Sequence, residues 1–215
     1  MRVGVIDYGA SNLGSVIGAL RELQTTPILI SKPKDMQSID KFILPGVGNF
    51  SDCAKSLNDS GWIEELQNQV LIKSKPLLGI CLGMQLLATS STEGITENAA
   101  EVVNGLNFIP GRVESLRSLG CSLCIPHVGW NNVRTSHNSS NDLFYDIPND
   151  TDFYFVHSYA FVPDDPMHQI ATTLYDLPIT AAISSGHIWG VQFHPEKSSR
   201  AGFKLLRNFI ENLSC

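Results

Sequence analysis

The stretch Leu77–Leu87 reads LLGICLGMQLL, and it carries the clearest structural signal in the chain. Its first residues form a short apolar run typical of a buried strand, and a helix is expected from about Gly83. Between them stands Gly-x-Cys-x-Gly, a strand-to-helix turn of the nucleophile-elbow type with Cys81 where serine is usual. The flanking glycines suit a turn in which backbones come close, because glycine has no Cβ atom. We therefore expect Cys81 at the end of a strand and at a helix N-terminus, where the helix dipole favours a thiolate.

Strands and helices alternate around this stretch in the first half of the chain. Short apolar runs predict strands at Val3–Ile6, Pro27–Ile30, Phe42–Leu44 and Leu77–Ile80. Such alternation implies right-handed crossovers and a parallel sheet with helices on both faces. The apolar residues at helical spacing are Leu13, Val16, Ile17, Leu20 and Leu23, and then Trp62, Ile63, Leu66 and Val70.

After about residue 100 the pattern changes to β-prone runs that favour antiparallel strands and hairpins. A final helix is expected from about Ser199, and the polar stretch Ser136–Asp142 is expected to be a surface loop. The fold class is thus an open, mostly parallel α/β sheet flanked by helices, with an additional antiparallel portion, in a single domain over residues 1–215. The β-prone runs are Gly111–Leu116, His127–Val133, Phe153–Val162, Ile170–Tyr175, Ile179–Ser184 and Ile188–His194.

Composition narrows the classes of function. The 215 residues carry a formal net charge of −6, so no basic field is present for nucleic acid or an anionic membrane surface. The most apolar stretch, Pro76–Ala88, is well short of the roughly 20 residues that span a bilayer. Asp7 interrupts the first apolar run too early for a signal peptide, and the 5 cysteines are an odd number, so we expect reduced thiols and a cytoplasmic location.

A second segment could supply a base for Cys81. Residues 190–198 read GVQFHPEKS, so a strand would deliver His194 to its C-terminal end with Glu196 across the following turn. Glu196 could accept a hydrogen bond from one ring nitrogen of His194 and leave the other nitrogen facing a thiol. Taken singly, an inert buried cysteine and a structural histidine are also ordinary interpretations.

A third segment, residues 45–48, reads PGVG and follows another strand of the same predicted sheet. A backbone N–H of this turn, at Val47, could point at the oxygen of a carbonyl group that Cys81 attacks. Together with the N–H of Leu82 it would make a two-donor oxyanion hole. The turn alone would equally fit a tight loop without a ligand.

Together, the three segments resemble the class I glutamine amidotransferases, which use a Cys-His-Glu triad, and this resemblance implies a flavodoxin-like fold. Further segments resemble one branch of that family, in which a glutaminase subunit forms a heterodimer with a (βα)₈-barrel cyclase of histidine biosynthesis. The resemblance covers nearly the whole chain. The additional matching segments are VIDYG at residues 5–9 with Asn12 and Leu13, PHVGWN at residues 126–131, and YFVHSY at residues 154–159.

The resemblance implies L-glutamine as substrate, ammonia as the channelled product and no cofactor. It makes Cys81 the nucleophile, His194 the general base and then acid, and Glu196 the group that orients His194. Without it, Gln85 and Glu93 would be ordinary helix and loop residues, and Trp130 a core residue. The matched positions form a glutamine-binding set, Gly48, Gln85, Glu93 and the strip His157, Ser158 and Tyr159, and a cyclase-facing set, Asn12, Trp130, Tyr154 and Lys197.

The remaining motifs do not indicate a cofactor site or a metal site. The stretch Gly9–Ser15 has the glycine spacing of a phosphate loop but lacks its lysine, and the glycines at 46 and 48 lack the third glycine of a dinucleotide site. Cys121 and Cys124 form a single Cys-x-x-Cys pair, whereas structural zinc sites normally show two ligand pairs. We expect no metal site.

Alternatives to the cyclase partner remain open at this point. Three features depart from the commonest pattern of the branch: Asn49, the Cys121/Cys124 pair and the Asn- and Ser-rich stretch. These departures keep a first alternative open, a paralogous glutaminase that feeds a surface-sugar amidation enzyme. A stand-alone cysteine hydrolase acting on peptides or γ-glutamyl chains is a second alternative, and a non-catalytic interaction module is a third.

Overall fold

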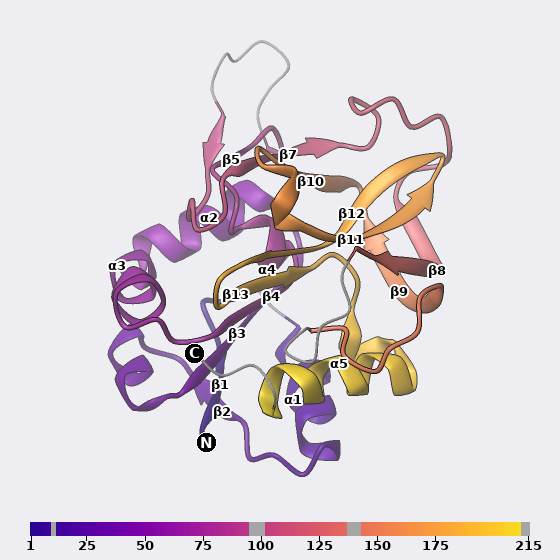
Figure 1. The fold of residues 1–215 in the computed structure, drawn as a ribbon. Helices are drawn as coiled ribbons and strands as arrows, with labels where there is room; N and C mark the ends of the chain where they lie inside the picture. The colour runs from indigo at the N-terminus through magenta and orange to yellow at the C-terminus, as the bar shows by residue number, and fades with distance from the viewer. Residues whose placement is uncertain (10–11, 95–101, 137–142, 212–215) are drawn as a thin grey trace.

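The computed structural model describes residues 1–9, 12–94, 102–136 and 143–211. Within these residues, nine strands form a larger sheet in the order β2-β1-β3-β4-β13-β12-β11-β8-β9, and four form a smaller sheet in the order β10-β7-β5-β6 (Figure 1). The expected α/β fold class, with a parallel part and an antiparallel part, is confirmed. The larger sheet comprises β2 (Ile28–Ile30), β1 (Val3–Ile6), β3 (Lys41–Gly46), β4 (Leu77–Cys81), β13 (Ile188–Val191), β12 (Leu177–Ser185), β11 (Gln169–Tyr175), β8 (His127–Thr135) and β9 (Thr151–His157).

Helices cover both faces of the parallel part, as the alternation predicts. Figure 1 shows α1 and α5 on one side of β1, β3 and β4, and α2 and α3 on the other. Side chains alternate accordingly, since Val5 and Leu78 pack with α1 and α5 while Ile6 and Leu77 pack with α2 and α3. The helices are α1 (Leu13–Glu22), α2 (Phe50–Asp59), α3 (Trp62–Leu66), which continues as the π-helix Gln67–Ile72, α4 (Leu82–Gln85) and α5 (Ser199–Glu211), with 3₁₀ turns at Pro33–Ser38, Pro166–His168 and Pro195–Lys197.

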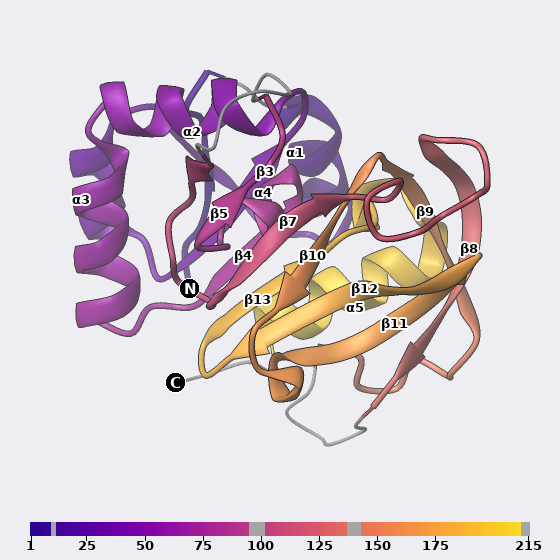
Figure 2. The ribbon, with the colours of Figure 1, turned by 90° about the horizontal axis from the view of Figure 1, so that it is seen from above.

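Strand β13 joins the two halves of the larger sheet. It pairs antiparallel with β12, as expected for the second half, but parallel with β4, where Val191 lies opposite Ile80. Its position beside β4 brings the residues that follow β13 to the same sheet edge as the end of β4 (Figure 2). The expected strand to His194 ends at Val191, and the backbone N–H of the next residue, Gln192, still donates to the carbonyl of Ala181 on β12 at 2.9 Å.

The run Phe153–Val162, expected as one strand, is two strands in different sheets. It breaks at Ser158, whose carbonyl accepts from the N–H of Leu116 at 2.9 Å. The residues before the break pair with β8, and Tyr159 after it pairs with Ser115 of β7. The break therefore places residues 157–159 where the two sheets meet. The smaller sheet comprises β10 (Tyr159–Pro163), β7 (Gly111–Ser115), β5 (Ser90–Ser91) and β6 (Val103–Asn104).

Helix α2 and the short strands β5 and β6 were not predicted from the sequence. Asn49, an unusual residue after the PGVG turn, caps α2 by accepting from the N–H of Ser51 at 2.8 Å and of Asp52 at 3.4 Å. Parts of the Gly9–Ser15 stretch and of the predicted loop Ser136–Asp142 lie outside the described residues, and so do residues 212–215 at the end of the expected final helix.

Candidate active site

Cys81 lies in a sharp turn between β4 and α4, as the Gly-x-Cys-x-Gly pattern predicts. Its backbone has φ 54° and ψ −111°, a strained conformation for a residue with a side chain. A Cβ atom at Gly79 would lie 2.6 Å from the carbonyl oxygen of Gly83, and one at Gly83 would overlap the carbonyl oxygen of Leu44 on β3. Both glycines are thus required for the turn. Helix α4 has only 4 residues, so the helix dipole contributes less to Cys81 than the sequence suggested.

His194 and Glu196 form a buried pair beside Cys81. Nδ1 of His194 lies 2.8 Å from Oε1 of Glu196, and their side chains are only 6% and 2% exposed. Burial lowers the pKa of His194, but hydrogen bonds to Cys81 and Glu196 and the charges of both outweigh it and raise the pKa to about 9. Ser198 fixes the turn, because its hydroxyl donates to the carbonyl of His194 at 2.6 Å and accepts from the N–H of Tyr154 at 3.0 Å.

A cavity of about 340 Å³ opens above Cys81. Residues from both halves of the chain line it, including most of those that the sequence singled out. Glu196 lies behind His194 and does not line it, and neither do Asn12, Trp130 and Tyr154, whereas Pro126 and Val156 do so without having been predicted. The predicted residues in the lining are Val47, Gly48, Cys81, Leu82, Gln85, Glu93, His157, Ser158, Tyr159, His194 and Lys197.

The turn after β3 packs directly against the elbow. A Cβ atom at Gly46 would lie 2.7 Å from the backbone nitrogen of Gly83, so the two turns are in contact. Gly48 has φ 106°, which favours glycine, and Val47 is 40% exposed at the cavity. The thiol of Cys53 on α2 donates to the carbonyl of Val47 at 3.7 Å and holds the turn from behind.

Polar side chains at the cavity are anchored by specific partners. Oε2 of Glu93 accepts from the N–H of Phe50 at 2.9 Å, and burial raises the pKa of the Glu93 carboxyl. Nε2 of Gln85 donates to the carbonyl of Tyr159 and to Oε1 of Gln192, both at 3.0 Å. Nε2 of Gln192 in turn lies 3.8 Å from the sulfur of Cys81. Gln192 was not singled out from the sequence, although it lies in the strand segment that carries His194.

Two buried histidines beside the cavity make stability sensitive to acid. Burial lowers the pKa of His127 to about 4 and, despite a hydrogen bond to Tyr159, lowers that of His157 to about 3. In the unfolded chain both titrate near 6.5, so between these values the unfolded state binds more protons than the native state. We expect the free energy of unfolding to fall as the pH decreases below 6.5, by up to roughly 2.7 kcal/mol per pH unit from the pair. Urea unfolding between pH 7.5 and 5 measures this slope, and a flat profile would contradict it.

Three of the four predicted partner-facing residues, Asn12, Trp130 and Tyr154, lie outside the cavity lining. Trp130 on β8 is 53% exposed, which corrects its interpretation as a core residue, and its ring packs edge-on against Tyr154 of β9 at 5.9 Å. Asn12 donates to Ser15 at 3.2 Å and shares a small void with Glu196 behind the elbow. Lys197 lines the cavity.

Within the described ranges, no cluster of three or more His, Cys, Asp or Glu could hold a metal ion, and Cys121 and Cys124 are separate free thiols. The described helices include none that is long and apolar enough to cross a membrane.

Changing Glu196 to Gln tests the pairing with His194. The amide removes the negative charge that helps to raise the pKa of His194, and it leaves the imidazole without its anionic partner. If the chain hydrolyses glutamine, as the family resemblance implies, we expect this activity to fall by about 100-fold or more, because acid–base catalysis by His194 usually contributes at least that much. Steady-state glutamate release measures the effect, with the melting temperature as a check on folding. Activity equal to that of the unchanged protein would exclude a role for Glu196.

The fold and this site define a class I glutamine amidotransferase. The family model described as Glutamine amidotransferase class-I matches residues 4–213, and the chain belongs to that family. Solved structures share the fold at low identity. A crystal structure of a glutamine amidotransferase aligns with a TM-score of 0.73, 21% identity and 98% coverage of both chains. PurLQS from Thermotoga maritima aligns with a TM-score of 0.74, 17% identity and 99% coverage of both.

Relatives that match the chain along nearly its whole length are named imidazole glycerol phosphate synthase subunit HisH. HisH 1 of Prochlorococcus marinus (strain MIT 9313) is 44% identical over 98% of this chain and 97% of its own length. HisH 1 of Campylobacter jejuni (strain RM1221) is 42% identical over 97% and 98%. HisH of Moorella thermoacetica is 42% identical over 97% and 94%.

Proposed function

We propose that this protein is the glutaminase subunit of an imidazole glycerol phosphate synthase. It hydrolyses glutamine to glutamate and ammonia, and it passes the ammonia to a (βα)₈-barrel cyclase subunit of histidine biosynthesis. The observation that carries the proposal is the buried His194–Glu196 pair beside Cys81 at the floor of a cavity. The full-length likeness to HisH subunits supports the choice of acceptor.

The reaction follows from the positions of these three groups. The Cys81 thiolate attacks the side-chain amide carbon of glutamine, and the carbonyl oxygen takes up negative charge. The His194 imidazolium then protonates the amide nitrogen, ammonia leaves and a thioester to Cys81 remains. Neutral His194 next takes a proton from water, the hydroxide adds to the thioester, and glutamate departs as Cys81 is regenerated. Glu196 holds the imidazole in place throughout.

The remaining cavity residues have separate roles in binding and stabilisation. The N–H groups of Val47 and Leu82 are the proposed oxyanion donors, and such a donor typically contributes about 3 kcal/mol to transition-state stabilisation. The Glu93 carboxylate suits the ammonium group of glutamine. Gly48, Gln85 and the strip 157–159 complete the proposed binding site around the substrate's polar groups.

Free ammonia would be protonated and lost in water, so the mechanism needs an enclosed route to an acceptor. The exposed pair of Trp130 and Tyr154, with Asn12 and Lys197, is the proposed contact surface for the cyclase in a heterodimer. We place the protein in the cytoplasm, because the reaction needs Cys81 as a free thiol.

Changing Trp130 to Ala should weaken the complex with the cyclase. A half-exposed aromatic side chain at an interface commonly contributes about 2 kcal/mol, which is roughly a 30-fold rise in the dissociation constant. Titration calorimetry with the purified barrel subunit measures the constant, and Leu174→Ala, a change at another exposed apolar residue, serves as the control. An unchanged affinity for the Trp130 variant would place the interface elsewhere.

Glutamate release in the presence of candidate partners tests the proposed function. The chain is purified with the histidine-pathway cyclase and, separately, with a cyclase-like barrel of a sugar-amidation pathway, and each mixture is assayed with and without its acceptor. We expect weak hydrolysis by the chain alone and strong stimulation by the histidine-pathway cyclase with its nucleotide. Stimulation only by the other barrel would favour the paralogue. Cleavage of peptides or γ-glutamyl chains without a partner would favour a stand-alone hydrolase.

A further inference from the structure

His157 of the strip 157–159 is the first in a line of three hydrogen-bonded side chains, and the other two, His127 and Asn131, lie on β8. Nδ1 of His157 lies 2.8 Å from the carbonyl oxygen of Tyr159. Nε2 of His157 lies 3.0 Å from Nδ1 of His127, and Nε2 of His127 lies 3.3 Å from Nδ2 of Asn131. His127 and His157 are only 3% and 5% exposed. His157 lines the cavity, whereas His127 does not.

With neutral rings, only one arrangement of protons satisfies every contact in this line. A carbonyl oxygen only accepts, so His157 carries its proton on Nδ1 and its Nε2 is an acceptor. His127 must therefore donate from Nδ1, and its own Nε2 accepts from the amide of Asn131. Burial lowers the pKa of both rings far below 7, so both stay neutral under physiological conditions. His127 thus fixes the tautomer and the ring orientation of His157.

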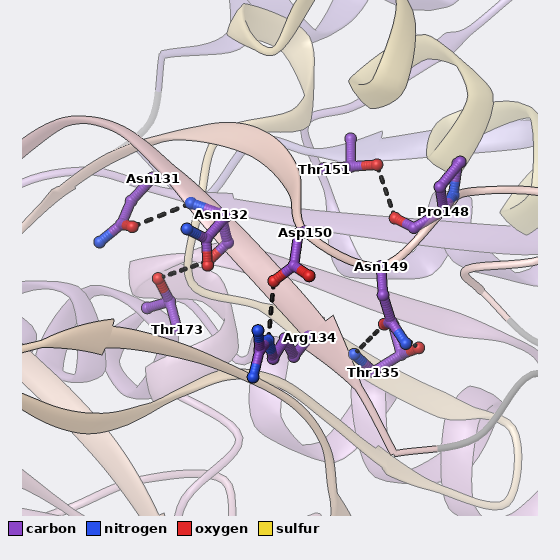
Figure 3. Close-up of polar contacts among 9 residues, drawn as sticks. All are labelled: Asn131, Asn132, Arg134, Thr135, Pro148, Asn149, Asp150, Thr151 and Thr173. Carbon is purple, nitrogen blue, oxygen red and sulfur yellow. Dashed lines mark hydrogen bonds and ion pairs between the residues drawn. The ribbon is translucent and has the colours of Figure 1, made fainter.

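Neighbouring residues contact both the ring nitrogens and the two faces of the His127 ring. Oδ1 of Asn131 accepts from the N–H of Asn132 at 2.9 Å, as Figure 3 shows, and Nδ2 of Asn131 also donates to the carbonyl of Leu174 at 2.9 Å. The amide of Asn131 is therefore oriented with its nitrogen toward His127. The His127 ring stacks on Tyr175 with centroids 4.0 Å apart and on Phe155 at 4.9 Å.

The other end of the line reaches the substrate cavity. The carbonyl of Tyr159 accepts from both His157 and Nε2 of Gln85, and Gln85 is bound to Gln192 beside Cys81. These bonds meet at the break between β9 and β10, where the larger sheet supplies His157 and the smaller sheet supplies Tyr159. His157 is therefore hydrogen-bonded, through the Tyr159 carbonyl, to the backbone of the strip at this break.

Resting on the proposed glutaminase function, we propose that His127 is a positioning residue for the substrate glutamine, acting through its hydrogen bond to His157 on the strip 157–159. His127 touches neither the cavity nor Cys81, so its loss should impair binding and orientation of glutamine more than the chemistry of the thiol.

Two variants separate the hydrogen bond from the ring stacking. His127→Asn retains an N–H donor close to the position of Nδ1 and removes the ring. His127→Phe retains a ring between Tyr175 and Phe155 and removes the donor. With the barrel partner present, we expect His127→Phe to raise the KM for glutamine at least about tenfold, and His127→Asn to raise it by no more than about threefold. A wild-type KM for His127→Phe, or a larger defect for His127→Asn, would overturn the proposal.

Alkylation of Cys81 distinguishes failure of this proposal from failure of the proposed function. Iodoacetamide reaches the thiol without using the strip, so its rate should be the same in all three proteins. A glutamine-analogue electrophile needs the strip, and its rate should fall about tenfold in His127→Phe. If the unchanged protein neither hydrolysed glutamine nor reacted with the analogue, the glutaminase function would be wrong. If it did both and His127→Phe matched it, only the positioning role would be wrong.

Histidine ¹⁵N NMR of the unchanged protein tests the arrangement even if a variant fails to fold. We expect His127 and His157 both to be the Nδ1–H tautomer and neither to titrate between pH 8 and 5. An Nε2–H tautomer at either residue, or titration near pH 6.5, would overturn the proposal.

Discussion

Changing Cys81 to Ser should reduce glutamine hydrolysis in the presence of the barrel partner by at least about 1000-fold. A serine hydroxyl stays protonated where a thiol beside an imidazole can ionise, so the His194–Glu196 pair is left without a reactive nucleophile. Steady-state glutamate release measures the loss. Synthesis by the partner with added ammonia should be unchanged, because free ammonia does not need the glutaminase reaction.

Cys124→Ser is the matched control for that experiment. Cys124 is an exposed free thiol outside the cavity lining, so the same chemical change there should leave both activities unchanged. Glutamine hydrolysis that survives in Cys81→Ser would contradict the mechanism. An equal loss in Cys124→Ser would move the reactive thiol to the Cys-x-x-Cys pair.

Changing Gly83 to Ala should have the largest effect on folding. The added Cβ atom would overlap the carbonyl oxygen of Leu44 and lie 2.8 Å from its carbonyl carbon, and backbone cannot move aside as a flexible side chain can. We expect a loss of about 3 kcal/mol in the free energy of unfolding, together with loss of glutamine hydrolysis, because the elbow and strand β3 must separate. Denaturant unfolding and glutamate release measure the two effects.

Gly18→Ala is the control for Gly83→Ala. Gly18 lies inside α1, and a Cβ atom there meets nothing within 4 Å. The free energy of unfolding should rise by about 0.5–1 kcal/mol, because alanine favours the helix. A Gly83→Ala protein as stable and active as the original would show that the elbow is looser than the structure indicates.

The local parts of the site could be predicted from the sequence. The glycines on either side of Cys81 permit the sharp turn there, whatever the rest of the fold. Only Pro195 separates His194 from Glu196, so these two side chains lie close together. The apolar pattern of β1, β3 and β4 likewise fixes their burial on two faces. These features depend on neighbours in sequence, so the order of residues is sufficient to show them.

The nonlocal parts could not be predicted from the sequence. Residues 157 and 159 belong to one β-prone run, and only the pairing of Ser158 with Leu116 divides them between two sheets. His127 and Gln192 form hydrogen bonds with partners that are 30 and 107 residues away in the chain, His157 and Gln85. The parallel pairing of β13 with β4 is of the same kind, since an apolar run does not show which strand it will join.

Mapping the residue that a glutamine analogue modifies tests the central claim, that Cys81 attacks glutamine, most directly. The protein is incubated with the electrophilic analogue and the barrel partner, digested and sequenced by mass spectrometry, with excess glutamine as competitor in a parallel sample. We predict a single adduct on the peptide that contains Cys81 and its suppression by glutamine. An adduct on another cysteine, or the absence of any adduct while glutamine is being hydrolysed, would contradict the account.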